Sequence, residues 1–197
     1  RLLKHLRGTK HKGLFFSASD DFVPSFTADY FEVPYDLTLN AYCDASFGDD
    51  PDTRRSTQGF VAMLCGAAIS WFCQGQKSTS LSTAEAELIA LADAIKEVKY
   101  IRETMTFLDL KQPGPTIIQE DNMAVVSTAH NPGKNHGKLK HVAIRVRSVQ
   151  ENVLEFHIID VVHCSTTHMI ADILTKALGK EQFTRLAAAI LGYAKLE

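Results

Sequence analysis

The order of its apolar segments is the feature of this sequence that most constrains the fold. Three apolar runs with short connections lie at about residues 37–46, 57–65 and 67–74, and such a series favours an antiparallel meander of strands. The segments that follow are expected at about 82–108 (helix), 116–119 (strand), 122–130 (helix), 139–153 (helix), 153–162 (strand), 168–178 (helix) and 180–191 (helix). This order predicts an α/β fold with a five-stranded mixed sheet, in which three antiparallel strands precede parallel ones and helices cover both faces.

One segment of this series has two interpretations. Apolar residues in 139–153 recur at helical spacing, and Val142, Ile144 and Val146 also alternate with other residues, as they would in a strand. The length of the segment favours a helix.

The longest predicted helix carries a carboxylate on its apolar side. Ser82 and Glu85 form a capping-box pattern at its start. Glu87 lies within about 40° of the apolar stripe on a helical wheel, whereas Glu85 projects about 200° away from Glu87 and is expected to face solvent. A carboxylate on a buried face is costly unless it is paired or binds a metal. The alternative is that Glu87 lies at the edge of the stripe and reaches water.

Three further acids occupy positions where a ligand site can form. Asp44 lies near the end of the first predicted strand before two small residues, Asp121 follows a short strand, and Asp172 lies in the first turns of a late helix. Each alone is an ordinary strand-end, cap or first-turn residue. Together with Glu87 they supply four carboxylates from four segments, which can hold two hard divalent cations and leave room for phosphate oxygens. The set therefore predicts phosphodiester cleavage.

The composition fits a globular domain. The chain has 197 residues, of which 45% are hydrophobic and 22% charged. No apolar run approaches the roughly 20 residues needed to span a bilayer, the N-terminus does not resemble a secretory signal, and the absence of an initial Met suggests a fragment. The net charge is −2, yet residues 1–12 and 131–150 carry basic residues and no acid. These two islands suit a phosphate backbone, or they are ordinary solvated charge.

The cysteines and the single tryptophan are expected to be structural. The four cysteines form no CxxC pair, which argues against a zinc site and favours buried, reduced thiols. Cys43 and Cys65 fall in apolar, strand-like runs, and Trp71 is predicted to lie in the core.

Several motifs together resemble one known family. They are YCDASFGDDPDTRRSTQGF, ISWFCQGQKSTSLSTAEAELIAL, EDNMAV, KHVAIR and ADILTKAL, in that order over about residues 37–180. The chain resembles the ribonuclease H domain of a copia-type LTR retrotransposon polyprotein. The opening RLLKHLRGTK is similar to the end of the reverse-transcriptase connection region. The resemblance therefore divides the chain into an extension at 1–36 and a ribonuclease H domain at 37–195.

The resemblance implies a ribonuclease H fold and hydrolysis of the RNA strand of RNA–DNA hybrids with two Mg²⁺ ions, for which Mn²⁺ substitutes. By resemblance, Asp44 bridges both ions and Asp172 completes the ion that activates water. Glu87 and Asp121 complete the ion that stabilises the leaving 3′ oxygen. The ions are expected about 4 Å apart, and the products carry 5′-phosphate and 3′-hydroxyl ends.

Substrate contacts and the cellular setting are further expectations. Candidate contacts to the hybrid, which otherwise serve as helix caps or solvated charges, are Arg55, Ser82, Thr83, Asn122 and Lys140. A loop histidine that aids proton transfer or product release in cellular relatives corresponds to His163 or His168. The implied partners are the hybrid and the reverse-transcriptase portion of the same polyprotein, with no membrane. The implied location is intracellular, in a cytoplasmic virus-like particle, with the nucleus as a second location.

Two other functions stay open. The first is a non-catalytic module, co-opted by the host for hybrid binding or protein contacts. The intact carboxylates disfavour this function, because a non-catalytic copy would tolerate their loss. The second is a DNA nuclease or transposase on the same fold, which the STAEAE and ADILTK pieces oppose.

Overall fold

The sheet has the predicted architecture. The computed structural model describes residues 11–16, 37–132 and 142–193. Its elements, in chain order, are β1 (Asn40–Ser46), β2 (Thr57–Leu64), β3 (Ala67–Gly75), α2 (Thr83–Phe107), β4 (Thr116–Glu120), α3 (Met123–His130), α4 (Ala143–Gln150), the π-helical turn η2 (Glu151–Glu155), β5 (Ile159–His163), α5 (Asp172–Thr175) and α6 (Lys180–Ile190). The five strands form one mixed sheet in the order β3-β2-β1-β4-β5.

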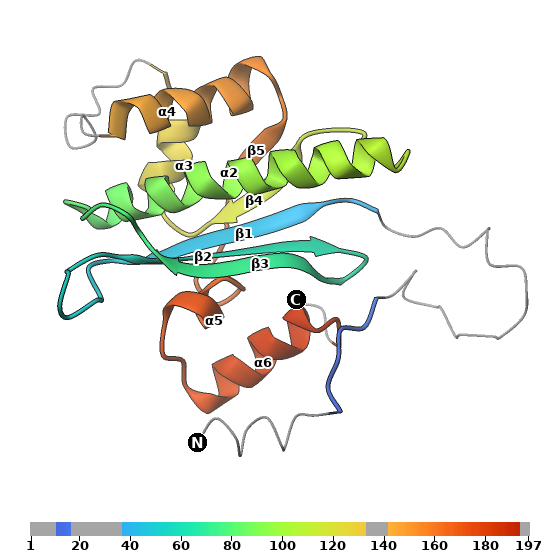
Figure 1. Cartoon of the computed structure of the whole chain (residues 1–197), viewed down its shortest axis with the longest axis horizontal. Helices are drawn as coiled ribbons and strands as arrows, with labels where there is room; N and C mark the ends of the chain where they lie inside the picture. The colour runs from blue at the N-terminus through green and yellow to red at the C-terminus, as the bar shows by residue number, and fades with distance from the viewer. Residues whose placement is uncertain (1–10, 17–36, 133–141, 194–197) are drawn as a thin grey trace, which may run out of the picture.

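The strand directions place β1 at the centre of the sheet. β1 pairs antiparallel with β2, and β2 with β3, whereas β4 runs parallel to β1 and β5 parallel to β4. Helices α2, α3 and α4 cover one face, and α5 and α6 cover the other (Figure 1). Asp44 and Gly59 are register partners near the end of β1. The fold class predicted from the segment order is confirmed.

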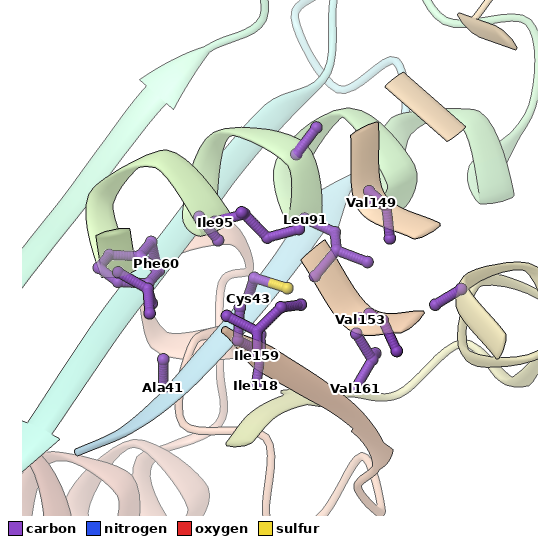
Figure 2. Packing of buried hydrophobic residues seen from close by; sticks show 14 of the residues in the cluster. Ala41, Cys43, Phe60, Leu91, Ile95, Ile118, Val149, Val153, Ile159 and Val161 are labelled. Atoms are coloured by element: carbon purple, nitrogen blue, oxygen red, sulfur yellow. The ribbon is translucent and has the colours of Figure 1, made fainter. Parts of the chain in front are cut away.

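The main core lies between the sheet and the three-helix face. Buried side chains of β1, β4 and β5 pack against α2 and α4, as Cys43, Leu91, Ile118 and Val149 illustrate in Figure 2. The predicted stripe of α2 is buried along its length, from Leu88 to Met105. Because this helix rests on β1 and β2, its first turns are held beside the end of β1.

The start of α2 corrects one prediction. Ser82 is the N-cap and accepts a hydrogen bond from the Glu85 amide, as the capping box requires. Glu85 does not face solvent, however; it is 4% exposed and accepts a hydrogen bond from the Leu81 amide. The helical wheel missed this because the segment before α2 folds back over the first turn, where buried Gln76 donates to the Ala86 carbonyl.

The second half of the chain departs from the expected boundaries. The ambiguous segment is helical in its described part, but the helix continues through η2, so the strand predicted from 153 starts at Ile159. Val149 and Val153, which lie four residues apart, are both buried in the main core. The segment therefore follows its helical pattern and not the strand-like alternation seen in the sequence. His157, with a φ of 50°, ends the helical run before β5.

The helix predicted at 168–178 is a single turn, α5, because the backbone becomes extended at Lys176. This turn lies close to β2. A Cβ built on Gly59 would be 2.8 Å from Thr175 Cγ2 and 3.2 Å from the Ala171 carbonyl oxygen, so only glycine permits this approach.

Other structural expectations have mixed outcomes. Trp71 is 56% exposed and not in the core, because β3 is an edge strand. Cys43 and Cys164 are buried, but Cys65 lies in the turn after β2 with a φ of 51°, and Cys73 is exposed. No helix in the described ranges is long and apolar enough to cross a lipid bilayer. Of the predicted extension at 1–36, only residues 11–16 are among those described.

Candidate active site

Three of the four predicted carboxylates meet at the end of β1. Asp44 comes from β1, Glu87 from the second turn of α2, and Asp121 from the residue that follows β4. One oxygen of each lies within 4.8 Å of the others, a separation at which the three can share a metal ion. Asp44 and Glu87 are buried, and Asp121 is half-buried.

The fourth carboxylate joins the site through a lysine. Asp172 is 1% exposed, and its Oδ1 accepts a hydrogen bond from Lys176 Nζ at 2.6 Å. The same Nζ is 2.9 Å from Asp44 Oδ1. Thr175 also donates its hydroxyl to Asp44 Oδ2. Asp172 and Asp44 therefore share one ammonium group, which places the α5 turn directly against the end of β1.

Burial and mutual repulsion disfavour ionisation in this cluster. Burial, followed by the charges of Glu120, Asp44 and Asp121, raises the pKa of Glu87 to about 10. Burial also raises the pKa of Asp172, despite its hydrogen bond to Lys176. Burial is the larger cause of both shifts and the neighbouring carboxylates add to it, so these acids favour their neutral forms unless a cation compensates their charge.

The charge balance is different at Lys176. Burial by itself would lower the pKa of this ammonium group, but hydrogen bonds and Coulomb attraction from Asp172 and Asp44 outweigh it, so the pKa is raised. The lysine therefore stays protonated and supplies positive charge to the cluster. Lys176 lies four residues after Asp172, a helical spacing in the sequence that could have revealed this pair.

A buried pair beneath the site was also missed by sequence reasoning. Glu120 is fully buried and accepts hydrogen bonds from the Cys43 thiol and the Asn122 amide. Burial raises its pKa to about 8, and burial likewise raises that of Cys43. The alternating burial of β4 points Glu120 inward, so Asp121 is the acid of this strand end that reaches the cleft.

The residues present fit divalent metal ions. The donor set consists of carboxylate oxygens, which are the ligands that Mg²⁺ and Mn²⁺ prefer. Glu87 Oε2 is buried and has no hydrogen-bond partner within the described residues, which is costly for a carboxylate unless a cation compensates it. An unsatisfied oxygen beside two further carboxylates is the arrangement that a metal ion completes.

Two of the predicted substrate contacts line a cleft at this site. Thr83 and Asn122 line an open cleft of about 510 Å³ together with Glu87, Asp121 and Lys176. Asn122 also caps α3, where its Oδ1 accepts a hydrogen bond from the Ala124 amide.

Among the described residues, the predicted contacts Ser82 and Arg55 do not line this cleft. Ser82 serves as the α2 cap, and Arg55 is exposed in the β1–β2 loop. Lys140 lies outside the described residues. His163 ends β5 and is exposed, and His168 lies in the following loop beside Thr167. From that loop, the Thr166 hydroxyl donates to Asp121 at 3.3 Å.

Comparison with known proteins supports the resemblance found in the motifs. The chain is 31% identical over 190 residues to the retrovirus-related Pol polyprotein from transposon RE1 of Arabidopsis thaliana, which covers 96% of the chain. It is 30% identical over 182 residues to the corresponding polyprotein from transposon TNT 1-94 of Nicotiana tabacum, which covers 92%. The chain spans 12% of the length of each of these relatives. No model of a known protein family matches it.

The fold also matches a solved structure. Ribonuclease H1 from Halobacterium salinarum superposes with a TM-score of 0.50 at 15% identity, over 70% of this chain and 93% of that one. At that identity the match concerns the fold. The chain is thus homologous to transposon Pol polyproteins and has a ribonuclease H fold.

Proposed function

We propose that this homologue of transposon Pol polyproteins is a divalent-metal-dependent endonuclease that hydrolyses the RNA strand of RNA–DNA hybrids during reverse transcription. The observation that carries the proposal is the convergence of Asp44, Glu87 and Asp121 within 4.8 Å, with Glu87 Oε2 buried and unpartnered among the described residues. Such a site concentrates negative charge in an open cleft, which suits cations that accompany a phosphate substrate.

Asp44, Glu87, Asp121 and Asp172 would hold two Mg²⁺ ions, and Mn²⁺ would substitute for them. Bound ions of this kind activate water and stabilise charge on phosphate oxygens, which gives 5′-phosphate and 3′-hydroxyl products. Asp44 is the central donor, because it is grouped with Glu87 and Asp121 and also shares Lys176 with Asp172. The burial of Asp44, Glu87 and Asp172 orients their oxygens before the substrate arrives.

The cleft supplies polar groups next to the carboxylates. Thr83 and Asn122 lie at the starts of two helices, and both line the cleft beside the acids. We expect them to meet the sugar–phosphate backbone, with 2′-hydroxyls and helix shape distinguishing the RNA strand. We also propose that the domain works inside the cell in a virus-like particle, beside the reverse-transcriptase portion of the same polyprotein.

The test is a cleavage assay with a labelled RNA–DNA hybrid and Mg²⁺, alongside duplex DNA and duplex RNA. We expect cleavage of the hybrid RNA alone. Asp44→Asn should reduce the rate at least about 100-fold while the far-UV circular dichroism is retained, because loss of a ligand costs more than loss of an outer-shell partner. Asp109→Asn, which changes an exposed acid after α2, is the matched control and should cleave normally.

Two results would contradict the proposal. Cleavage by Asp44→Asn at the wild-type rate would show that the site is misassigned. Binding of the hybrid by the unaltered protein without any cutting would favour the non-catalytic module.

A further inference from the structure

The side chain of Lys176 lies between two carboxylates of the candidate site and contacts both. Its Nζ is 2.9 Å from Asp44 Oδ1 and 2.6 Å from Asp172 Oδ1. The two carboxylates are almost completely buried, whereas 35% of the lysine side chain is exposed. The ammonium group is therefore the solvent-facing member of this trio, and it borders the cleft that also contains Glu87 and Asp121.

We propose that Lys176 is an internal counterion that holds the cation position between Asp44 and Asp172 until a divalent metal ion displaces it. This inference rests on the proposed function, because it takes both carboxylates as metal ligands. An ammonium group donates to the same oxygens that a divalent cation needs as ligands. Two cations at one pair of oxygens repel each other, so metal binding and this lysine contact compete.

The position of the lysine makes such an exchange feasible. Lys176 follows the last residue of α5, and its backbone is extended, so its side chain is not locked within a helix. A lysine has a flexible four-carbon stem and a strongly hydrated head group. Because the side chain is already partly exposed, rotation of the stem can move the ammonium group into water without unfolding the α5 turn.

Other roles for Lys176 predict different measurements. A purely structural ion pair would stabilise the fold both with and without metal, and its removal would leave metal affinity unchanged. A contact to a substrate phosphate would affect hybrid binding and again leave metal affinity unchanged. If Lys176 is an internal counterion, its removal changes stability and metal affinity in opposite directions. The metal-free fold becomes less stable, and metal binding becomes tighter.

The experiment is calorimetric titration of the full chain with Mn²⁺, without nucleic acid. Lys176→Met removes the charge and keeps an apolar stem. Lys180→Met, at the first residue of α6, removes the same charge four residues later and serves as the control. We expect the Mn²⁺ Kd to fall at least about tenfold in Lys176→Met, which corresponds to about 1.4 kcal/mol. The control should stay within about twofold of wild type, because an exposed charge is screened.

Thermal unfolding in EDTA supplies the second readout. Lys176→Met should unfold at a lower temperature than wild type in EDTA, and saturating Mn²⁺ should raise its Tm by more than it raises that of wild type. If Lys176→Met does not fold, Lys176→Gln replaces it. Lys176→Arg keeps the charge and should bind Mn²⁺ no more tightly than wild type.

The outcomes separate this inference from the proposed function. An unchanged or weaker Mn²⁺ affinity in Lys176→Met, with a wild-type protein that binds Mn²⁺, overturns the counterion alone. If Lys176→Met binds Mn²⁺ more tightly than wild type, and neither protein cleaves the hybrid, the result supports the counterion and contradicts the nuclease. Absence of Mn²⁺ binding in both wild type and Lys176→Met overturns both ideas.

Discussion

Gly59 is the position where one added carbon should disturb the site without touching a carboxylate. It lies in β2 opposite Asp44 and faces the α5 turn. An added Cβ would be 2.8 Å from Thr175 Cγ2, 3.0 Å from Leu174 Cβ and 3.2 Å from the Ala171 carbonyl oxygen. Ordinary contacts between carbons are about 3.5–4.0 Å, so Gly59→Ala must push α5 away from the sheet.

The magnitude follows from two opposing effects. Overpacking costs about 1–3 kcal/mol, whereas replacing glycine lowers the entropy of the unfolded chain and returns about 0.4–1 kcal/mol. The neighbours cannot rotate away freely, because one is a backbone carbonyl and another belongs to Thr175, which donates to Asp44. We therefore expect a net loss of about 1–2 kcal/mol in the free energy of unfolding.

Metal binding and cleavage should weaken together with stability. Asp172 is the first residue of the α5 turn and Lys176 follows its last, so a shift of this turn moves both away from Asp44. A misplacement of about 1 Å can cost about 100-fold in rate, and a shift of roughly half that size should cost about tenfold.

Urea unfolding, Mn²⁺ titration and hybrid cleavage measure the three effects of Gly59→Ala. Gly75→Ala is the control, because a Cβ at Gly75 meets nothing within 4 Å in the described part of the chain. If Gly59→Ala matches Gly75→Ala in all three assays, the close approach of α5 does not position the site.

Two further predictions concern α2. In EDTA, Glu87→Gln should gain stability relative to wild type as the pH rises from about 5 to about 9. Burial raises the folded pKa of Glu87 to about 10, so the wild-type protein loses stability over this range as its unfolded state releases the proton. Urea midpoints at three pH values measure the trend, and a difference that is flat or of opposite sign contradicts it. Ser82→Ala should lower the free energy of unfolding by about 1 kcal/mol through loss of the cap to the Glu85 amide. If instead hybrid affinity falls and stability does not, Ser82 is a substrate contact and not mainly a cap.

Local patterns were sufficient to predict the sheet and the proximity of three carboxylates. The helical wheel placed Glu87 on the buried side of α2, and the structure groups it with Asp44 and Asp121. Those predictions succeeded because each depends on one regular element or on the end of one strand. Asp121 follows from the rule that ligand sites form at the carboxyl ends of strands in open α/β sheets. Asp44 was placed by its strand end and small neighbours, and the parallel pairing of β1 with β4 brings both acids to one edge of the sheet.

The failures occur where distant segments decide the outcome. Glu85 is buried by the loop that precedes α2, which no wheel can include. Trp71 is exposed because β3 is at the edge of the sheet, and the strand order is not encoded in the apolar run itself. The predicted helix at Asp172 shortened to one turn, since the backbone leaves helical geometry at Lys176.

The site depends on both faces of the sheet, and this explains why the contact of Lys176 with Asp44 escaped sequence reasoning. Glu87 comes from the layer of α2, whereas Asp172 and Lys176 come from the α5 side (Figure 1). The central strand β1 lies between these layers, and Asp44 near its end meets contributions from both. Each layer must therefore hold its distance from β1 for the carboxylates to share cations. Packing of α2 fixes one distance through a continuous apolar stripe, whereas the other depends on the close approach of the short α5 turn to Gly59 and on the contacts of Thr175 and Lys176 with Asp44. We therefore expect the α5 side to be the more easily perturbed half of the site.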